Sequence, residues 1–202
     1  ERAREMERQG EDIIHLEVGE PDFSVPSPVR KATCRALEEG ATHYTHSLGD
    51  IQLREAICEH YLDAYGLEVK PEQVVVTSGT SPAMMLAFAS LLERGEEVIV
   101  SDPAYACYPN FINFLGGVPS RVPVYEQDGF QYRVPAIEER INQKTKAILI
   151  NSPSNPTGCL ISEMDMKAIA GLSPYIISDE IYHGLVYEGQ EHSILEFTDR
   201  AF

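Results

Sequence analysis

Tryptophan is absent from the 202 residues of this chain, and cysteine is scarce. The four cysteines contain no C-x-x-C pair, and their spacing suits neither a zinc site nor a disulfide framework. They are Cys34, Cys58, Cys107 and Cys159. We expect them to be small buried apolar residues in a reducing cytosol, so the predicted localisation is cytoplasmic. The six histidines lack the spacing of metal ligands, and no metal site is predicted.

Long apolar runs and an excess of positive charge are also missing. No run approaches the roughly 20 apolar residues of a membrane-spanning helix, and the first residues lack the apolar core of a signal peptide. The chain carries 16 basic and 32 acidic residues, for a net charge of −16. This charge argues against nucleic acid or an anionic membrane as a partner. We therefore expect neither partner, and we expect most acids to lie on a solvated surface.

What the sequence does contain is an alternation of strands and helices from residue 74 onward. Its length permits one sizeable core, and β-branched runs alternate with helical patterns. The expected strands are Val74–Thr77, Glu97–Val100, Arg121–Val124, Ala147–Ile150 and Tyr175–Ser178, with helices over 81–92, 109–115, 134–141 and 162–170. Such alternation indicates βαβ units, an α/β fold and a mainly parallel sheet. Prolines in the third run favour an edge strand.

Three helices are expected before this region. The patterns predict a short helix over 3–9, a helix over 27–39 with Ser27 as its N-cap, and a helix that Asp50 caps and Gly66 ends. The tail from Leu185 to Phe202 has no clear pattern.

The most informative stretch is Asn151–Gly158, read Asn-Ser-Pro-Ser-Asn-Pro-Thr-Gly, which follows an apolar strand. A second strand runs directly into Asp179-Glu180-Ile181-Tyr182. Loops at the carboxyl ends of parallel strands are where α/β sheets bind ligands. If the two strands are neighbours, the side chains of Asn155, Asp179 and Tyr182 converge on one pocket.

Two further segments carry candidate binding residues. Ser78-Gly79-Thr80-Ser81 joins a strand to a helix, so its free N–H groups suit an anion. A capped helix start without a ligand gives the same pattern. Tyr105, in the run Asp102–Pro109, suits either a ring-stacking surface or core packing.

The combination of motifs resembles a known family. Asn-Pro-Thr-Gly at 155–158, followed by Ser-Asp-Glu-Ile-Tyr at 178–182, is similar to the pyridoxal-phosphate-dependent class I/II aminotransferases, the fold-type-I enzymes that include aspartate aminotransferase. The resemblance implies a three-layer α/β/α large domain with a mainly parallel sheet. It also implies pyridoxal 5'-phosphate as cofactor and transfer of an amino group between an amino acid, aspartate or a related donor, and a 2-oxo acid.

The resemblance assigns roles to the residues that contact the cofactor. Gly79, Thr80 and Ser81 match the phosphate loop, and Tyr105 matches the aromatic residue that lies on the cofactor ring. Asp179 matches the carboxylate that keeps the ring nitrogen protonated, so that the ring withdraws electrons. Asp179 and Tyr182 are the expected catalytic residues.

Further matches concern the substrate and the partner subunit. Tyr182 and Asn155 match residues that hydrogen-bond the phenolic oxygen of the cofactor. Gly19 matches a loop glycine near the substrate carboxylate, which Asn155 also approaches. Tyr44 matches a tyrosine that reaches the phosphate of the partner subunit, so a homodimer with shared active sites is expected. As alternatives, Tyr182 and Tyr44 suit a half-buried and an exposed aromatic residue, respectively.

The lysine that holds the cofactor as a Schiff base is not found. The five lysines, none of which follows a strand near Asp179, are Lys31, Lys70, Lys144, Lys146 and Lys167. In the family this lysine follows the Asp-x-x-Tyr motif, and its position falls just past Phe202. The resemblance therefore divides the chain into an N-terminal arm and helix over 1–40 and a truncated cofactor-binding domain over 41–202. We expect this chain by itself to be inactive.

The alternatives are a carbon–sulfur lyase of the same fold type and the aminotransferase-like ligand-sensing domain of a transcription regulator. The resemblance also implies that at least one of the bonds Asp102–Pro103 and Asn155–Pro156 is cis. It further implies a seven-stranded sheet whose sixth and seventh strands come after Phe202. Val74–Thr77 and Tyr175–Ser178 are then separated by the positions of two absent strands.

Overall fold

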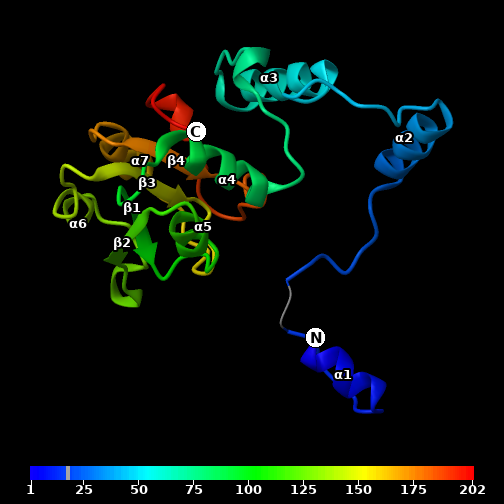
Figure 1. The fold of residues 1–202 in the computed structure, drawn as a ribbon, viewed down its shortest axis with the longest axis horizontal. Coiled ribbons are helices and arrows are strands. Elements are labelled where there is room, and N and C mark those ends of the chain that lie inside the picture. The colour runs from blue at the N-terminus through cyan, green and yellow to red at the C-terminus, as the bar shows by residue number, and fades with distance from the viewer. Residues whose placement is uncertain (17–18) are drawn as a thin grey trace. The chain divides into compact units, whose positions relative to one another are not determined.

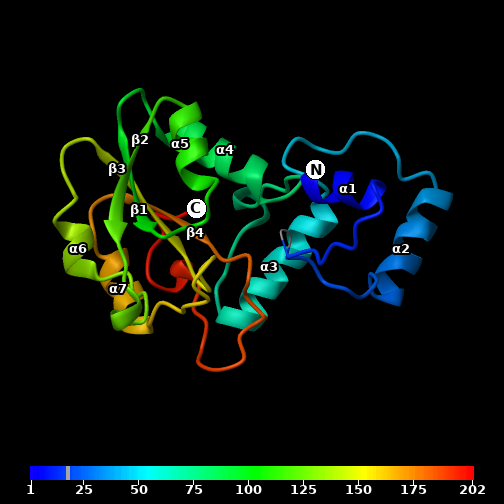
Figure 2. The ribbon, with the colours of Figure 1, turned by 90° about the horizontal axis from the view of Figure 1, so that it is seen from below.

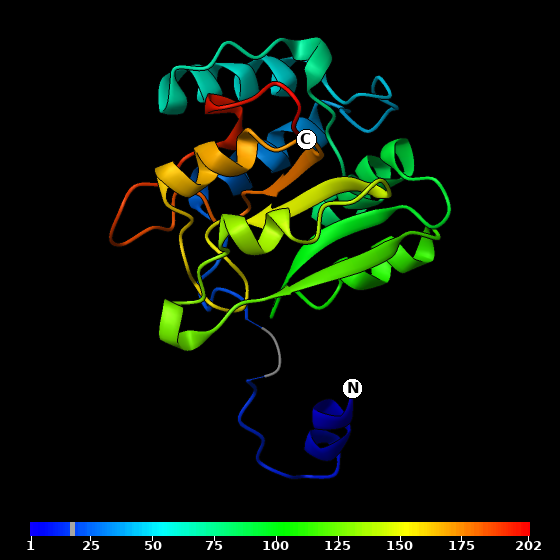
Figure 3. The ribbon, with the colours of Figure 1, turned by 90° about the vertical axis from the view of Figure 1, so that its left-hand side faces the viewer.

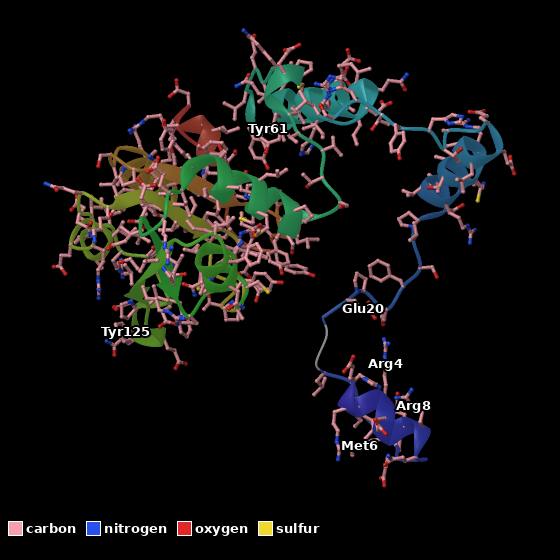
Figure 4. The ribbon with its side chains drawn as sticks, in the orientation of Figure 1. Arg4, Met6, Arg8, Glu20, Tyr61 and Tyr125 are labelled. Carbon is pink, nitrogen blue, oxygen red and sulfur yellow. The ribbon has the colours of Figure 1, made fainter. Side chains whose placement is uncertain are left out.

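The computed structural model describes residues 1–16 and 19–202, which divide into the units Glu1–Thr45 and His46–Phe202 (Figure 1). The first unit contains α1 (Arg2–Arg8) and α2 (Ser27–Glu38), neither of which buries a residue. Arg4, Met6 and Arg8 project from α1 in different directions (Figure 4). Both helices lie within one residue of their predicted bounds. Ser27 is not the N-cap of α2, because Pro26 occupies that position and no side chain caps the helix.

The second unit is built on a four-stranded parallel sheet, which confirms the α/β prediction. Its strands are β1 (Glu97–Asp102), β2 (Val118–Pro123), β3 (Thr145–Asn151) and β4 (Tyr175–Asp179). Their order is β2-β1-β3-β4. The strand order reverses between β1 and β3, and ligands bind outside the carboxyl ends of the strands at such a point.

Helices cover both faces of this sheet, which gives the expected three layers. The helices α4 (Thr80–Leu91) and α5 (Tyr108–Phe114) lie on one face, and α6 (Val134–Glu138) and α7 (Glu163–Ala170) lie on the other (Figures 2 and 3). The first face buries a cluster of Met84, Phe88, Val98, Val100, Tyr108, Ile112, Ala147, Leu149 and Ile177. The second face buries a larger cluster that includes Ile99, Tyr132, Ile137, Ile148, Ile150, Met166, Ile169, Ile176 and Ile194.

The remaining elements are α3 (Ile51–Tyr65) and the short 3₁₀ helices η1 (Pro71–Gln73), η2 (Glu126–Asp128) and η3 (Ile194–Glu196). The predicted caps of α3 are confirmed. The Asp50 carboxylate accepts from the Gln52 amide at 2.8 Å, and Gly66 ends the helix with a φ of 70°. Ser162, predicted to open a helix, is the N-cap of α7 and accepts from the Asp165 amide.

The prediction of buried cysteines is wrong for Cys34, which is exposed because α2 buries none of its residues. Cys58, Cys107 and Cys159 are only partly buried, and all four thiols are free. No helix among the described residues has the length and apolar character needed to cross a membrane.

Residues 74–77, predicted to form the first strand, are extended but belong to no sheet, so that prediction is wrong. A strand requires a neighbour for its hydrogen-bonding ladder, and no described residue pairs with this segment. The segment is held by a loop instead, where the Val76 amide donates to the Leu48 carbonyl at 2.9 Å. The loop approaches so closely that a Cβ on Gly49 would lie 2.5 Å from the Val76 Cβ.

The free edge of β4 pairs with the end of the chain. The Phe202 amide donates to the Ile176 carbonyl at 2.9 Å, and Ile176 forms a parallel bridge with Ala201. The pairing is an isolated bridge outside the named strands, and the position of the sixth strand stays a prediction. This pairing was not visible in the sequence because the segment Arg200–Phe202 is too short to show an alternating pattern.

A hollow of about 680 Å³ lies between residues 74–77 with α4 on one side and β4 with Phe202 on the other. Its lining is largely apolar and includes Val75, Ala83, Leu86 and Ile177. Val75 and Leu86 are 50% and 56% exposed. The structure therefore shows no closed five-stranded sheet, and it leaves a space between the first extended segment and the end of the chain.

The opposite edge of the sheet is β2, as its prolines predicted. The Val118 amide donates to the Glu96 carbonyl and the Val124 amide to the Asp102 carbonyl, so these donors face β1. Successive residues of a strand point their N–H groups to opposite sides. The outward positions are therefore Pro119, Arg121 and Pro123, of which two carry no N–H group.

The contrast between a buried and an exposed residue of α4 gives a first prediction. Phe88 has no exposed surface in the core, so we expect Phe88→Ala to lower the free energy of unfolding by about 3–5 kcal/mol. We expect Leu86→Ala, on the face toward the hollow, to change it by less than about 0.5 kcal/mol. Urea unfolding of the 202-residue chain measures both values, and equal losses would contradict this assignment of the core.

A second prediction concerns alkaline pH. Burial raises the pKa of Tyr132 well above its ordinary value of 10, so this phenol keeps its proton in the folded state when the unfolded chain has lost it. Its stabilising contribution is therefore complete below pH 10 and decreases above it. We expect Tyr132→Phe to make the fall of unfolding free energy above pH 10 shallower by up to about 1.4 kcal/mol per pH unit. Urea unfolding across that range is the measurement, and an unchanged slope would refute the prediction.

Candidate functional site

Three strands have polar residues at their carboxyl ends, which lie at the same end of the sheet. Asp102 ends β1, Asn151 ends β3 and Asp179 ends β4. Asn151 and Asp179 are direct partners in the register of β3 and β4. The expectation that these two strands are neighbours is therefore confirmed, and the loops that follow them start side by side.

The side chain of Asn151 joins these loops. Its Nδ2 donates to the Asp179 carbonyl at 2.8 Å, while its Oδ1 accepts from the Asn155 amide at 2.6 Å. One amide group therefore links the end of β4 to the Asn155 turn. Beyond this link, the Asn155 Nδ2 donates to the Tyr182 hydroxyl oxygen at 3.1 Å. The structure thus brings Asn155 and Tyr182 into direct contact from two different loops.

Asp179 has a buried carboxylate, with the residue only 8% exposed. Its Oδ2 accepts from the Tyr108 hydroxyl at 2.7 Å, and its Oδ1 accepts from the Ile181 amide at 3.2 Å. Among the residues that the structure describes, no basic side chain forms an ion pair with it. A buried charge without an opposite charge is costly, so this carboxylate suits a cationic group on a ligand.

Tyr105 lies next to this carboxylate and is 37% exposed. Its ring meets the ring of Tyr108 edge-on, with centroids 5.3 Å apart. A hydrogen bond with Cys107 is the main cause that raises the pKa of Tyr105, and the charges of Tyr182 and Asp179 contribute further. Tyr105 thus presents a partly exposed aromatic surface close to both Asp179 and Tyr182.

The predicted anion cradle lies at the start of α4. Gly79 is the N-cap residue with a φ of 98°, a conformation that favours glycine. The helix begins at Thr80, one residue before the predicted start, because Gly79 rather than a side chain takes the cap position. Thr80 and Ser81 are exposed, so the N–H groups of the first turn are open to an anion. Thr80 and Asp179 line the same hollow described above.

Other predicted residues lie elsewhere. Gly19 and Tyr44 belong to the first unit, and their roles stay predictions. In the second unit, Lys146 is at the amino end of β3, where its Nζ lies 3.6 Å from a Glu96 carboxylate oxygen. Lys70, Lys144 and Lys167 are exposed. None of these lysines is at the carboxyl ends of the strands.

Sequence reasoning gave no role to several residues that organise the site. Tyr108 and Asn151 are the clearest, and their positions held a signal. Tyr108 follows Tyr105 by three residues at the start of a helix, and Asn151 directly follows the apolar run of β3. What the sequence did not show is which oxygen or amide each side chain reaches.

A second polar network lies behind the site, around Glu180. Its Oε1 accepts from the Ser178 hydroxyl at 2.8 Å and from the Ile194 amide at 2.9 Å, which holds η3 against the end of β4. Tyr61 projects from α3 (Figure 4). Burial raises the pKa of Tyr61, and the negative charge of Glu180 raises it further. These contacts fix the loop that carries Tyr182.

The bonds Asp102–Pro103 and Asn155–Pro156 are both cis, which confirms the expectation that at least one of them is. A third cis bond, Ser152–Pro153, was not anticipated.

Comparison with known proteins identifies the family. The family model for aminotransferase class I and II matches residues 11–201. The chain belongs to the class I and II aminotransferases. This aminotransferase family depends on pyridoxal phosphate, as the resemblance of the two motifs implied.

The names of similar proteins agree with this assignment. The (5-formylfuran-3-yl)methyl phosphate transaminase of Methanocaldococcus jannaschii is 44% identical over 98% of this chain and 51% of its own length. A probable aspartate/prephenate aminotransferase of Aquifex aeolicus is 42% identical over 92% of this chain and 48% of its own length. The chain thus spans about half the length of these aminotransferases.

A solved aminotransferase structure shows the same fold. Aspartate aminotransferase from Thermus thermophilus with maleate superimposes with a TM-score of 0.96 at 38% identity, over 99% of this chain and 54% of that one. The large-domain fold of the family is therefore present in these residues.

The bridging role of Asn151 leads to a prediction. We expect Asn151→Ala to lower the free energy of unfolding by about 1–3 kcal/mol, because it leaves the Asn155 amide without its partner. It also removes one of two donors to the Asp179 carbonyl, which keeps the Ser152 amide at 3.3 Å. Hydrogen exchange of the Asn155 amide should become faster. Asn110→Ala is the control, since this exposed side chain donates to the Ala106 carbonyl four residues earlier in the chain and lies outside the site. Unchanged exchange at Asn155 would refute the role of Asn151.

Proposed function

We propose that these residues form the cofactor-binding part of a pyridoxal-phosphate-dependent aminotransferase that transfers an amino group between an amino acid and a 2-oxo acid. The observation that carries the proposal is the buried Asp179 carboxylate, which has no basic partner among the described residues and lies beside the Asn155–Tyr182 pair. The names of the relatives favour aspartate or a related amino acid as donor.

The residues present fit this cofactor. A buried carboxylate suits the protonated ring nitrogen, the exposed part of Tyr105 suits the ring face, and the open first turn of α4 suits the phosphate. When bound, the cofactor supplies an electron-withdrawing ring to the carbon atom that loses its proton. The protein's task is to hold that ring in a fixed position and charge state.

Each side chain then has a defined task. The amides of Gly79, Thr80 and Ser81 hold the phosphate, helped by the hydroxyls of Thr80 and Ser81. Asp179 keeps the proton on the ring nitrogen.

Two other residues would bind the phenolic oxygen of the cofactor. The Tyr182 hydroxyl would donate a hydrogen bond to this oxygen. The Asn155 Nδ2, which donates to the Tyr182 oxygen at 3.1 Å, would orient that hydroxyl. Asn155 also approaches the substrate carboxylate.

The rest of the enzyme belongs to this proposal as well. Gly19 contacts the substrate carboxylate, and residues 1–40 form part of a smaller domain. Tyr44 binds the phosphate of the partner subunit in a homodimer. The lysine that holds the cofactor covalently lies in the part of the protein beyond these residues, and the enzyme works in the cytoplasm, where its four free thiols stay reduced.

Replacement of Asp179 tests the proposal. In the full-length protein, we expect Asp179→Ala to lower the rate of amino transfer from aspartate to 2-oxoglutarate by about 100-fold or more, because the ring nitrogen loses its charged partner. The matched control is Asp128→Ala, which removes the same charge from an exposed turn. Circular dichroism verifies that both variants fold. The 202-residue chain alone should show no transfer.

The assay separates the alternatives. Near-normal turnover of Asp179→Ala would remove this residue from its role. A wild-type protein that converts a cysteine thioether and water into a thiol, a 2-oxo acid and ammonia, without any 2-oxo acid acceptor, would instead be a carbon–sulfur lyase. The aminotransferase proposal would then be wrong.

A further inference from the structure

Tyr108 is the first residue of α5 and one of the largest fully buried side chains, with 1% of its surface exposed. Its ring lies in the apolar cluster between α4, α5 and the sheet. Only its hydroxyl is polar, and that hydroxyl donates to the Asp179 Oδ2 at 2.7 Å. The position of the carboxylate is therefore determined by a rigid ring in the core as well as by its own strand.

We propose that Tyr108 is a positioning residue that holds the Asp179 carboxylate in its charged form toward the ring nitrogen of the cofactor. This inference rests on the proposed function. Tyr108 itself does not touch the cofactor in this role and acts through Asp179.

The two hydrogen bonds on Asp179 support this role. The Ile181 amide binds Oδ1 and the Tyr108 hydroxyl binds Oδ2, so both oxygens are held and the carboxylate plane cannot rotate without breaking a bond. Hydrogen bonds to the charged form of a carboxylate favour that form. When the carboxylate shares a proton with a ring nitrogen, the Tyr108 hydroxyl therefore favours the arrangement in which the nitrogen holds the proton.

The hydroxyl is a dependable donor. Burial first, and then the hydrogen bond and charge of Asp179, raise the pKa of Tyr108 far above its ordinary value. At neutral pH the phenol therefore keeps its proton and donates a hydrogen bond to the carboxylate.

Tyr108 also contacts the stacking residue. Its ring meets Tyr105 edge-on with an interplanar angle of 77°, a favourable arrangement for two aromatic rings. One buried side chain thus contacts both the carboxylate for the ring nitrogen and the tyrosine for the ring face. It sets the spacing between these two contacts.

The test uses pyridoxamine phosphate, which binds without a covalent bond to the protein and therefore reports on the site without turnover. The probe carries ¹⁵N at its ring nitrogen, whose chemical shift distinguishes the protonated from the neutral ring. In the full-length protein at neutral pH, we expect Tyr108→Phe to move this shift toward the neutral value. We also expect the dissociation constant of pyridoxamine phosphate to rise about tenfold in this variant, as for the loss of one charge-assisted hydrogen bond.

Two further variants separate positioning from mere packing. Tyr132→Phe is the matched control, because Tyr132 is also buried and its hydroxyl has no hydrogen-bond partner within the described part of the chain. We expect it to leave both the chemical shift and the affinity unchanged. Replacement of Tyr108 by 3-fluorotyrosine keeps the ring and strengthens the donor, so the ¹⁵N shift should move in the opposite direction to that in Tyr108→Phe.

The outcomes are distinguishable. Binding by the wild type with a protonated nitrogen, together with opposite shifts in the two Tyr108 variants, supports the proposal. If the wild type binds the probe but neither Tyr108 variant changes the ¹⁵N shift of the bound probe, the positioning role is wrong while the proposed function stands. If the wild type does not bind the probe, the proposed function fails and this inference fails with it.

Discussion

The pairing of β3 with β4 is the constraint on which the candidate site depends. It places Asn151 directly beside Asp179, and from that register follow the bond that anchors the Asn155 turn and the position of the buried carboxylate. A shift of one residue would reverse which side chains of β4 face the α4–α5 cluster. The same hydrogen-bonding ladder thus determines both the apolar faces of the sheet and the polar residues at the carboxyl ends of its strands.

The core and the site share residues as well. Tyr108 belongs to the apolar cluster on one face of the sheet, yet its hydroxyl reaches a carboxylate at the edge. Glu180 likewise has two roles. Its carboxylate accepts from the Ile194 amide of η3, and its backbone leads into the loop that carries Tyr182. A site built in this way is rigid, because its polar groups are oriented by side chains that cannot move without disturbing the packing.

Much of this arrangement could be predicted from the sequence. The four strands, the caps of α3 and α7, and the neighbouring positions of β3 and β4 followed from apolar runs and the turn residues after them. Residues 74–77 have the composition of a strand but have no neighbouring strand among the described residues. Whether a segment has such a neighbour depends on distant parts of the chain and cannot be read from its own residues. The pairing of Arg200–Phe202 and the contacts of Tyr108 and Asn151 depend equally on distant parts of the chain, so no local pattern could have revealed them.

The two edges of the sheet differ in the backbone groups that they present for pairing with another strand. At β2, two of the three outward positions are prolines, so an approaching strand finds almost no donors there. At the other edge, β4 pairs with Arg200–Phe202 beside an open apolar hollow. The β2 edge thus offers little for strand pairing, whereas the β4 edge has already paired with a distant segment of the same chain.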